Sequence, residues 1–239
     1  MRHLKKRALL PVIAVLGTMS MNPAQAAFDI SVEAAGVLNS TASFSSSGVE
    51  TFDSLSTGNG QTFTSTFGGT GISGTFSGVN IVPANQYGGA GGTGNYATDG
   101  AGSFTVTLGS AVTYFGLWIS ALNSTNNLSF YSNGVLVEQF TPIDLINLVS
   151  GQPAYYGNPS GTYAGQDGSE PFAFTNFYDT TGTFNQIVVS GFGFESDNYT
   201  VGTFTAQAGT TVGAPEPISI ALLGTGLAGL GIAKRRKSR

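Results

Sequence analysis

The chain of 239 residues has no cysteine, a single histidine and only nine lysine and arginine residues. Four of these basic residues precede Ala8, five follow Ala233, and the histidine is His3. Residues 27–213 therefore contain no basic side chain at all. Of the thirteen acidic residues only Glu216 lies outside this segment, so its formal charge is −12.

These absences exclude several classes of function for residues 27–213. Without cysteine and histidine there is no Cys–His nucleophile pair, no usual base for a serine triad and no histidine–cysteine zinc site. Without lysine and arginine there is no Schiff-base chemistry and no phosphate clamp, and the negative charge repels nucleic acid. Carboxylate chemistry remains, either as a glycosidase-like acid pair or as oxygen ligands for a metal. We expect no enzymatic activity.

The first 26 residues have the three-part pattern of a secretory signal peptide. A basic start is followed by a mostly apolar stretch at 8–21 and by the small-residue site Ala24-Gln25-Ala26. We predict cleavage by signal peptidase after Ala26, so that the exported protein begins at residue 27. An uncleaved N-terminal anchor is the alternative, which the shortness of the apolar run disfavours.

The C-terminal residues 215–239 form a second terminal signal. The triplet Pro215, Glu216, Pro217 precedes sixteen uncharged residues, 218–233, and these lead into a basic tail of Lys234, Arg235, Arg236, Lys237 and Arg239. The uncharged run is slightly shorter than the roughly 20 residues of a typical membrane-spanning helix, and its glycines are better tolerated in a membrane than in water. We predict a transmembrane helix at 218–233 with the tail on the cytoplasmic side, after a spacer at 208–214.

The triplet, the Gly/Leu-rich segment LLGTGLAGLG and the basic end together resemble the PEP-CTERM sorting signal. The resemblance implies recognition by an exosortase, a membrane-embedded cysteine transpeptidase-like enzyme of Gram-negative bacteria. It also implies an intermediate anchored in the inner membrane, removal of the tail, and delivery to the cell surface or extracellular matrix. Such cells usually make extracellular polysaccharide. A permanent membrane anchor is the alternative.

Residues 27–207 have the pattern of one all-β domain. Apolar and polar residues alternate at 28–33, 62–67 and 103–108, and longer apolar runs at 112–121 and 184–194 are typical of buried central strands. Further strands are predicted at 127–132, 135–140 and 203–207, the first two as a hairpin across Asn133-Gly134. Thr141-Pro142-Ile143-Asp144 predicts one helix start. This pattern favours a jelly-roll-like β-sandwich.

The glycine-rich stretch Gly89–Gly94 matches the dinucleotide-binding pattern G-x-G-x-x-G. No apolar helix follows it, so we interpret it as a turn between strands. In its wider context, residues 78–98 resemble part of an ectodomain that recurs among PEP-CTERM surface proteins. The resemblance covers most of residues 48–204 and is carried also by the segments 52–58, 114–131, 170–178 and 191–202. This resemblance implies a location and a fold, and no chemistry.

Three acidic residues form a candidate calcium site. Glu195 and Asp197 are two residues apart, which places both carboxylates on one face of an extended segment about 6–7 Å apart. Asp53 completes the set if the strands that carry these residues are neighbours. Carboxylate oxygens suit Ca²⁺, which takes six to eight oxygen ligands. Solvated loop acids are the alternative interpretation.

Aromatic residues in the long polar loop at 150–170 are candidates for contact with a glycan. These residues are Tyr155, Tyr156 and Tyr163, and packing of the loop onto the sandwich is the alternative. Trp118 lies in an apolar run and is predicted to belong to the core. The sequence thus predicts a surface or matrix protein with a structural or adhesive role in exopolysaccharide. The alternative is a secreted carbohydrate-active enzyme that uses a carboxylate pair.

Overall fold

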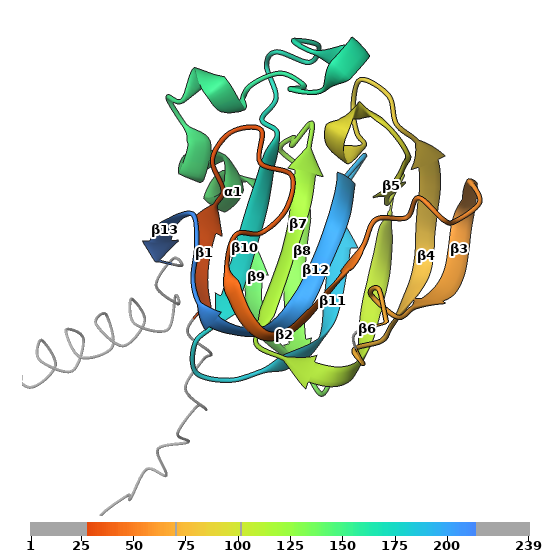
Figure 1. The fold of residues 1–239 in the computed structure, drawn as a ribbon, viewed down its shortest axis with the longest axis vertical. Helices are drawn as coiled ribbons and strands as arrows, with labels where there is room; N and C mark the ends of the chain where they lie inside the picture. Colours follow the sequence, from red (N-terminus) through yellow and green to blue (C-terminus); the bar gives the residue numbers. More distant parts are fainter. Residues whose placement is uncertain (1–27, 70, 101, 214–239) are drawn as a thin grey trace, which may run out of the picture.

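A computed structural model describes residues 28–69, 71–100 and 102–213 of the chain (Figure 1). These residues form β-strands, one α-helix, α1 (Pro142–Val149), and the short 3₁₀ turns η1 (Ala90–Gly92), η2 (Pro153–Tyr155) and η3 (Gly161–Tyr163). The strands are β1 (Phe28–Val32), β2 (Ser43–Glu50), β3 (Gly58–Ser65), β4 (Gly74–Pro83), β5 (Asn95–Thr98), β6 (Ser103–Val112), β7 (Tyr114–Ser120), β8 (Asn127–Ser132), β9 (Val135–Phe140), β10 (Ala173–Asp179), β11 (Phe184–Ser190), β12 (Glu195–Ala206) and β13 (Thr210–Gly213).

The strands form a single antiparallel sheet that curls into two facing layers, as Figure 1 shows. One layer has the order β13-β1-β10-β7-β12-β2, and the other has the order β3-β4-β6-β11-β8-β9. Strand β5 joins the layers along one side, because it pairs with the first residues of β12 and the last residues of β4. Helix α1 follows β9 and contacts β1 on the other side. The predicted all-β sandwich is confirmed.

Aromatic and aliphatic side chains fill the space between the layers. In β6 the residues alternate between exposed and buried positions, and Phe104, Val106 and Leu108 point inward. Phe130 lies at the centre of an aromatic cluster and has ring-centroid distances of 5.0–5.3 Å to Phe28, Phe177 and Phe184. The Phe130–Phe184 pair is edge-to-face and the other two pairs are tilted, and aromatic pairs contribute roughly 0.5–1.5 kcal/mol each beyond simple burial. Aromatic packing stabilises a domain that has neither disulfides nor basic partners for its acids.

The outer face of the layer that contains β7 and β10 is also covered. Every residue of these two strands is buried, since the segment 33–42 and η1 lie across them. Trp118 and Phe174 form a second apolar cluster on this face, against Leu38 and Ala90. The prediction that Trp118 belongs to the core is confirmed, because only 1% of its surface is exposed.

A buried polar network fastens segment 33–42 to the sheet. The Glu33 carboxylate accepts hydrogen bonds from the Thr41 backbone (2.8 Å) and hydroxyl (2.7 Å) and from the Asn176 amide (3.1 Å). The Asn176 side-chain oxygen in turn accepts bonds from the Tyr114 hydroxyl (2.6 Å) and the Ser40 hydroxyl (2.8 Å). Within this network each buried polar side chain has a partner, which is what burial requires.

The predicted local elements are present. Asn133 and Gly134 have φ values of 49° and 81°, and two positive values in succession define the type I′ turn that joins β8 and β9. At the start of α1 the Asp144 carboxylate accepts bonds from the backbone and hydroxyl of Thr141 at 2.8 and 2.7 Å. This arrangement is the capping box that the sequence predicts.

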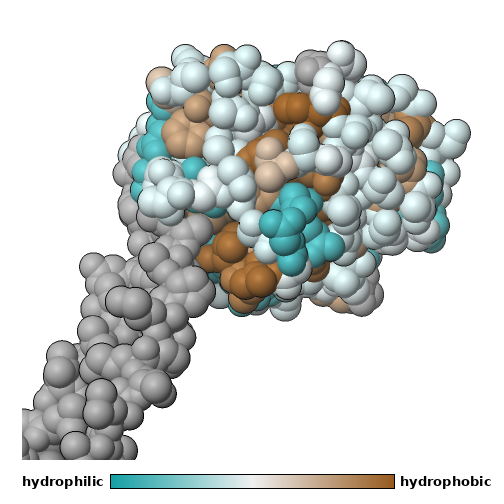
Figure 2. All heavy atoms as spheres, turned by 90° about the horizontal axis from the view of Figure 1, so that it is seen from below, coloured by the Kyte–Doolittle hydropathy of each residue, from teal (hydrophilic) through white to brown (hydrophobic). Residues whose placement is uncertain are grey.

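Both ends of the described chain leave the sandwich at the same place. Strand β13 pairs with β1, and the register sets Gly213 opposite Asp29, next to Phe28. Residues 210–213, which the sequence assigns to a spacer, are therefore part of the sheet. Figure 2 looks onto this end of the molecule and shows apolar side chains gathered beside strongly polar ones. Val135 and Leu136, at the hairpin tip of β9, are exposed there.

The two predicted terminal signals lie outside the described residues. This holds for the signal peptide at 1–26 and for the segment 214–239, with its predicted membrane helix at 218–233. Within the part of the chain that the structure describes, no helix has both the length and the apolar character needed to cross a membrane.

Candidate functional site

An open hollow lies at the end of the sandwich opposite the chain ends. It has a volume of about 230 Å³ and is lined by Tyr87, Ala121, Asn123, Glu170, Phe192, Gly193 and Glu195. These residues come from four loops, 84–94, 121–126, 150–172 and 191–194, and from the first residue of β12. The strand register brings the loops together, because Glu195 lies opposite Thr98 of β5 and Ser120 of β7.

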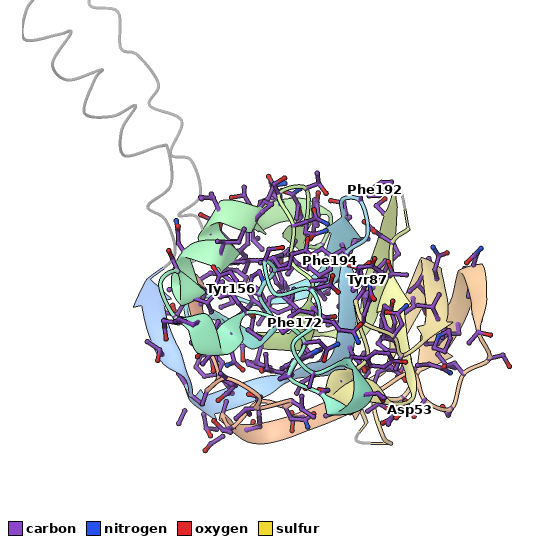
Figure 3. All side chains as sticks on the ribbon, turned by 90° about the horizontal axis from the view of Figure 1, so that it is seen from above. Asp53, Tyr87, Tyr156, Phe172, Phe192 and Phe194 are labelled. Atoms are coloured by element: carbon purple, nitrogen blue, oxygen red, sulfur yellow. The ribbon has the colours of Figure 1, made fainter. Side chains whose placement is uncertain are left out.

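Two aromatic side chains at the hollow are exposed to solvent. Phe192 is 68% exposed and Tyr87 is 44% exposed, although most large apolar side chains of the described chain are buried. Figure 3 looks onto this end of the sandwich and shows Tyr87 and Phe192 on the same side, beside β12, with Phe194 between them and the interior. Two exposed aromatic rings beside one hollow offer a ligand apolar faces that have one side open to solvent.

Hydrogen bonds fix the backbone that presents these rings. The Phe192 N–H donates to the Thr125 hydroxyl (3.1 Å), and the Phe192 carbonyl accepts from the Asn123 amide (2.9 Å). On the other side, the Asn85 side-chain oxygen accepts from the Tyr87 N–H (2.8 Å) and from the Tyr96 hydroxyl (3.2 Å). The rings are exposed, and the turns that carry them are held in place.

Glu195 is the titratable group of the hollow with the most strongly raised pKa. Burial, together with the nearby carboxylates of Asp99, Glu170 and Asp167, raises its pKa to about 8. Among the described residues, no other residue donates a hydrogen bond to the Glu195 carboxylate. Gly193 leaves room for this side chain, because a Cβ there would lie 3.0 Å from Oε1 of Glu195.

Further carboxylates with incomplete bonding surround Glu195. The Asp99 Oδ1 accepts a bond from the Phe194 N–H (2.8 Å), whereas its buried Oδ2 has no partner in the structure. The Oδ2 of Asp167 is likewise buried without a partner. Burial raises the pKa of both groups and that of Glu170, for which Asp167 is a second cause. This end of the molecule therefore concentrates negative charge that the described chain does not neutralise.

The structure does not assemble the three predicted calcium ligands as one set. Asp197 is buried, and its two oxygens accept bonds from the backbone N–H groups of Ala90 (2.8 Å) and Asn198 (2.7 Å). Asp53 is exposed and accepts a bond from the Asn95 N–H at 3.0 Å. Within the described residues, no group of three or more acidic side chains is placed to hold a metal ion.

Glu195 and Asp197, the two carboxylates at the start of β12, are affected by different acidic residues. The pKa of Asp197 is raised to about 7, first by burial and then by Asp53 and Glu50. Glu195 is instead affected by the acids around the hollow. The carboxylate of Asp197 therefore serves to hold the glycine-rich turn and the bulge of β12.

The three tyrosines predicted to contact a glycan pack the long loop onto the sandwich instead. Tyr155 is only 7% exposed, and its hydroxyl donates to the Glu33 carbonyl at 2.8 Å. The Tyr163 hydroxyl donates to the Ala84 carbonyl at 3.2 Å, and Tyr156 packs partly buried against the core. The loop contributes Glu170 to the hollow, a residue that the sequence did not single out.

Comparison with known proteins bears on the C-terminal end of the chain. Residues 214–237 match the family model of the PEP-CTERM protein-sorting motif. No match was found among curated proteins or among solved structures. The matched segment starts immediately after β13, so the motif follows the last strand of the sandwich directly. The predicted sorting signal is confirmed, and it marks the chain as an exported protein that an exosortase processes.

Proposed function

We propose that this exported, exosortase-sorted protein is a structural or adhesive component of an exopolysaccharide matrix. The sorting motif at residues 214–237 is the observation that carries the proposal. It supports export of the sandwich across the membrane and a route to the cell surface. The matrix role then follows from what the folded domain offers to its surroundings there.

The geometry of the sandwich supports this role. The motif follows β13, and Gly213 lies at the end of the sandwich where the chain leaves. The hollow with Tyr87 and Phe192 lies at the opposite end, where β12 begins opposite the end of β7. A domain held by its C-terminus therefore directs the hollow away from the membrane and toward the matrix.

The chemistry of the surface supports it too. A segment with a formal charge of −12 and no lysine or arginine stays hydrated and offers no cleavage sites to trypsin-like proteases. It repels anionic polysaccharides unless a cation lies between them. Stable attachment in the matrix thus requires either a cation bridge, for which Ca²⁺ remains our proposed ion, or contacts with a glycan that is not anionic.

The intact mass of the protein recovered from the surface or medium of its host tests the proposal. We expect a chain that begins at Ala27 and ends near Pro215-Glu216-Pro217, found together with the extracellular polysaccharide. A host strain without exosortase activity is the control, and there the chain should keep Lys234 to Arg239. Recovery of the full tail from the surface of the normal host would show that the segment is a permanent anchor.

A second candidate function is a secreted carbohydrate-active enzyme. The observation in its favour is that Glu170 and Glu195 line one open hollow and that the raised pKa of Glu195 keeps it protonated near neutral pH. A protonated acid beside a second carboxylate is the arrangement that glycosidases use. Release of reducing ends from the host polysaccharide, lost in Glu195→Gln with the fold retained, would establish this function. Binding without turnover would support the matrix role.

A further inference from the structure

We propose that the hollow binds a protonated amine carried on a sugar ring, that is, an unacetylated amino sugar in a polysaccharide. The inference rests on the proposed function, because it identifies the kind of glycan that this surface protein would hold. Its basis is the combination, in one open hollow, of two carboxylates and two exposed aromatic rings: Glu170, Glu195, Tyr87 and Phe192.

The carboxylates define the charge of the ligand. Glu195 is partly buried, receives no donor from another residue in the described chain, and has three more acids nearby in Asp99, Asp167 and Glu170. A carboxylate that is removed from water without a donor is unfavourable, and an ammonium group supplies both the donors and the opposite charge. A phosphorylated or uronic-acid ligand would meet only repulsion. No lysine or arginine within residues 27–213 can supply the missing cation.

The aromatic rings define the shape of the ligand. Faces of phenylalanine and tyrosine attract a cation within about 6 Å, and they also contact the apolar C–H face of a sugar ring. A volume of about 230 Å³ is somewhat below the roughly 300–1,000 Å³ of pockets that enclose a drug-sized molecule. The hollow is open to solvent, so it suits one ring of a chain that continues on both sides.

The side chains at the rim add neutral hydrogen-bonding groups. Asn123 lines the hollow and donates through its amide to the Phe192 carbonyl at 2.9 Å, while its side-chain oxygen accepts bonds from the Thr125 backbone and hydroxyl. These bonds keep the loop of Phe192 in position and are independent of the acids. The aromatic wall is therefore preformed, which lowers the entropic cost of binding.

Binding of an amine at this site predicts a proton release that a merely structural glutamate would not produce. Because the pKa of Glu195 is raised to about 8, the free protein holds a proton there at pH 7. The groups that face Glu195 are Asp99, Asp167, Glu170 and Tyr96, and none is cationic. An ammonium group stabilises the ionised form, so an amine that is already protonated in solution releases this proton into the buffer when it binds, whereas a neutral amine takes the proton from Glu195 with no net release.

Titration calorimetry with the processed protein from its host tests the inference. The probe is an oligomer of glucosamine, and the comparison probe is the same oligomer with every amine acetylated. We expect binding of the first to be at least about tenfold tighter than of the second. At pH 6, where both Glu195 and the amine carry a proton before binding, the binding heat should depend on the ionisation enthalpy of the buffer. Equal affinity for the two oligomers, or no binding of either, would overturn the inference.

Variants locate the binding to the hollow. Glu195→Gln and Phe192→Ala should each lower the affinity for the glucosamine oligomer at least about tenfold. Glu195→Gln should also remove the dependence of the binding heat on the buffer. Asp29→Asn is the matched control, since it removes one negative charge at the opposite end of the sandwich and should leave affinity unchanged. Thermal unfolding verifies that each variant is folded.

Two further probes separate the sugar from other cations. A lysine oligomer carries the same ammonium groups without a ring; if it binds as tightly as the glucosamine oligomer, the inferred ligand class is wrong. Calcium chloride at millimolar concentration should compete only weakly with the glucosamine oligomer. Complete displacement of the oligomer would assign the hollow to a metal ion instead. If the surface protein is processed as proposed but binds no amine, this inference alone fails, whereas an unprocessed protein would contradict the proposed function itself.

Discussion

Replacing Glu195 by glutamine should make the stability of the protein less sensitive to pH. In the folded chain the pKa of Glu195 is raised from 4.5 to about 8, because burial and neighbouring acids disfavour its ionised form. The folded state thus binds this proton more tightly than the unfolded state does. The stabilisation from Glu195 is fully present below pH 4.5, the ordinary pKa, and is lost as the pH rises through about 8.

The size of the effect follows from the same values. One pKa unit corresponds to about 1.4 kcal/mol, so ionising Glu195 in the folded state costs at most about 5 kcal/mol. Solvent reaches part of this side chain, which lowers the figure to about 2 kcal/mol. For a domain of this size that amounts to about 4–8 °C in the midpoint of thermal unfolding.

The assay is thermal unfolding of the processed protein between pH 5 and pH 9, without added ligand. At pH 5 the normal protein and Glu195→Gln should have similar midpoints, since a protonated carboxyl and an amide are both neutral. Toward pH 9 the midpoint of the normal protein should fall further, by about 4–8 °C relative to the variant. Asp29→Asn corrects for the general repulsion among the acids of the domain. Parallel pH curves for the normal protein and Glu195→Gln would refute the reasoning.

Three other substitutions test the packing that positions the site, each measured by urea-induced unfolding. Gly116→Ala in β7 should lower the free energy of unfolding by roughly 1–3 kcal/mol, because the added Cβ would clash with the Tyr114 hydroxyl. Gly102→Ala is the control and should have a much smaller effect, since a Cβ there would have nothing within 4 Å. Equal losses of stability in the two variants would contradict the close packing over β7. Thr141→Ala removes half of the capping box of α1 and should cost about 1 kcal/mol, and an unchanged midpoint would show that tertiary packing alone holds the helix. Tyr155→Phe removes a buried hydrogen bond and should cost about 1 kcal/mol, an effect that a tyrosine on the surface would not have.

The sequence predicts well those elements that depend on nearby residues. Alternation in Ser103–Val112 reflects one buried face of a strand, the pair Asn133-Gly134 suits the positive φ values of a tight hairpin, and Thr141 with Asp144 defines a helix start. Each of these patterns reflects a preference of neighbouring residues for one local conformation, and the folded chain has that conformation. For that reason the β-sandwich, its hairpin and its single helix in the described residues could be predicted.

Elements that depend on distant partners could not be predicted in the same way. The start of β12, Glu195-Ser196-Asp197-Asn198, has the composition of a polar loop, yet three of these residues are buried in a central strand. Their polar groups are satisfied from far away in the sequence: Asn198 donates to the Leu38 carbonyl at 2.9 Å, and Asp197 accepts from Ala90. No local pattern contains these partners.

The hollow was missed for a related reason. Its residues are spread from Tyr87 to Glu195, and only the strand register brings their loops together. One local signal was present: Phe192 stands between Gly191 and Gly193, where neighbouring side chains cannot bury it. An aromatic residue flanked by glycines in a loop is therefore a better indicator of an exposed contact than the tyrosines of the long loop, whose polar neighbours fold them onto the sandwich.

The antiparallel register links the sorting signal to the hollow. Strands β1 and β13 lie side by side and place Phe28 and Gly213 at one end, while β12 starts at the other end, opposite the last residue of β7. Removal of both predicted terminal signals would leave a chain whose charged side chains are all acidic. Its long-range field then attracts cations to the whole surface. Within the described residues, the hollow combines partly desolvated carboxylates with exposed aromatic faces, and we propose that the general attraction becomes selective binding there.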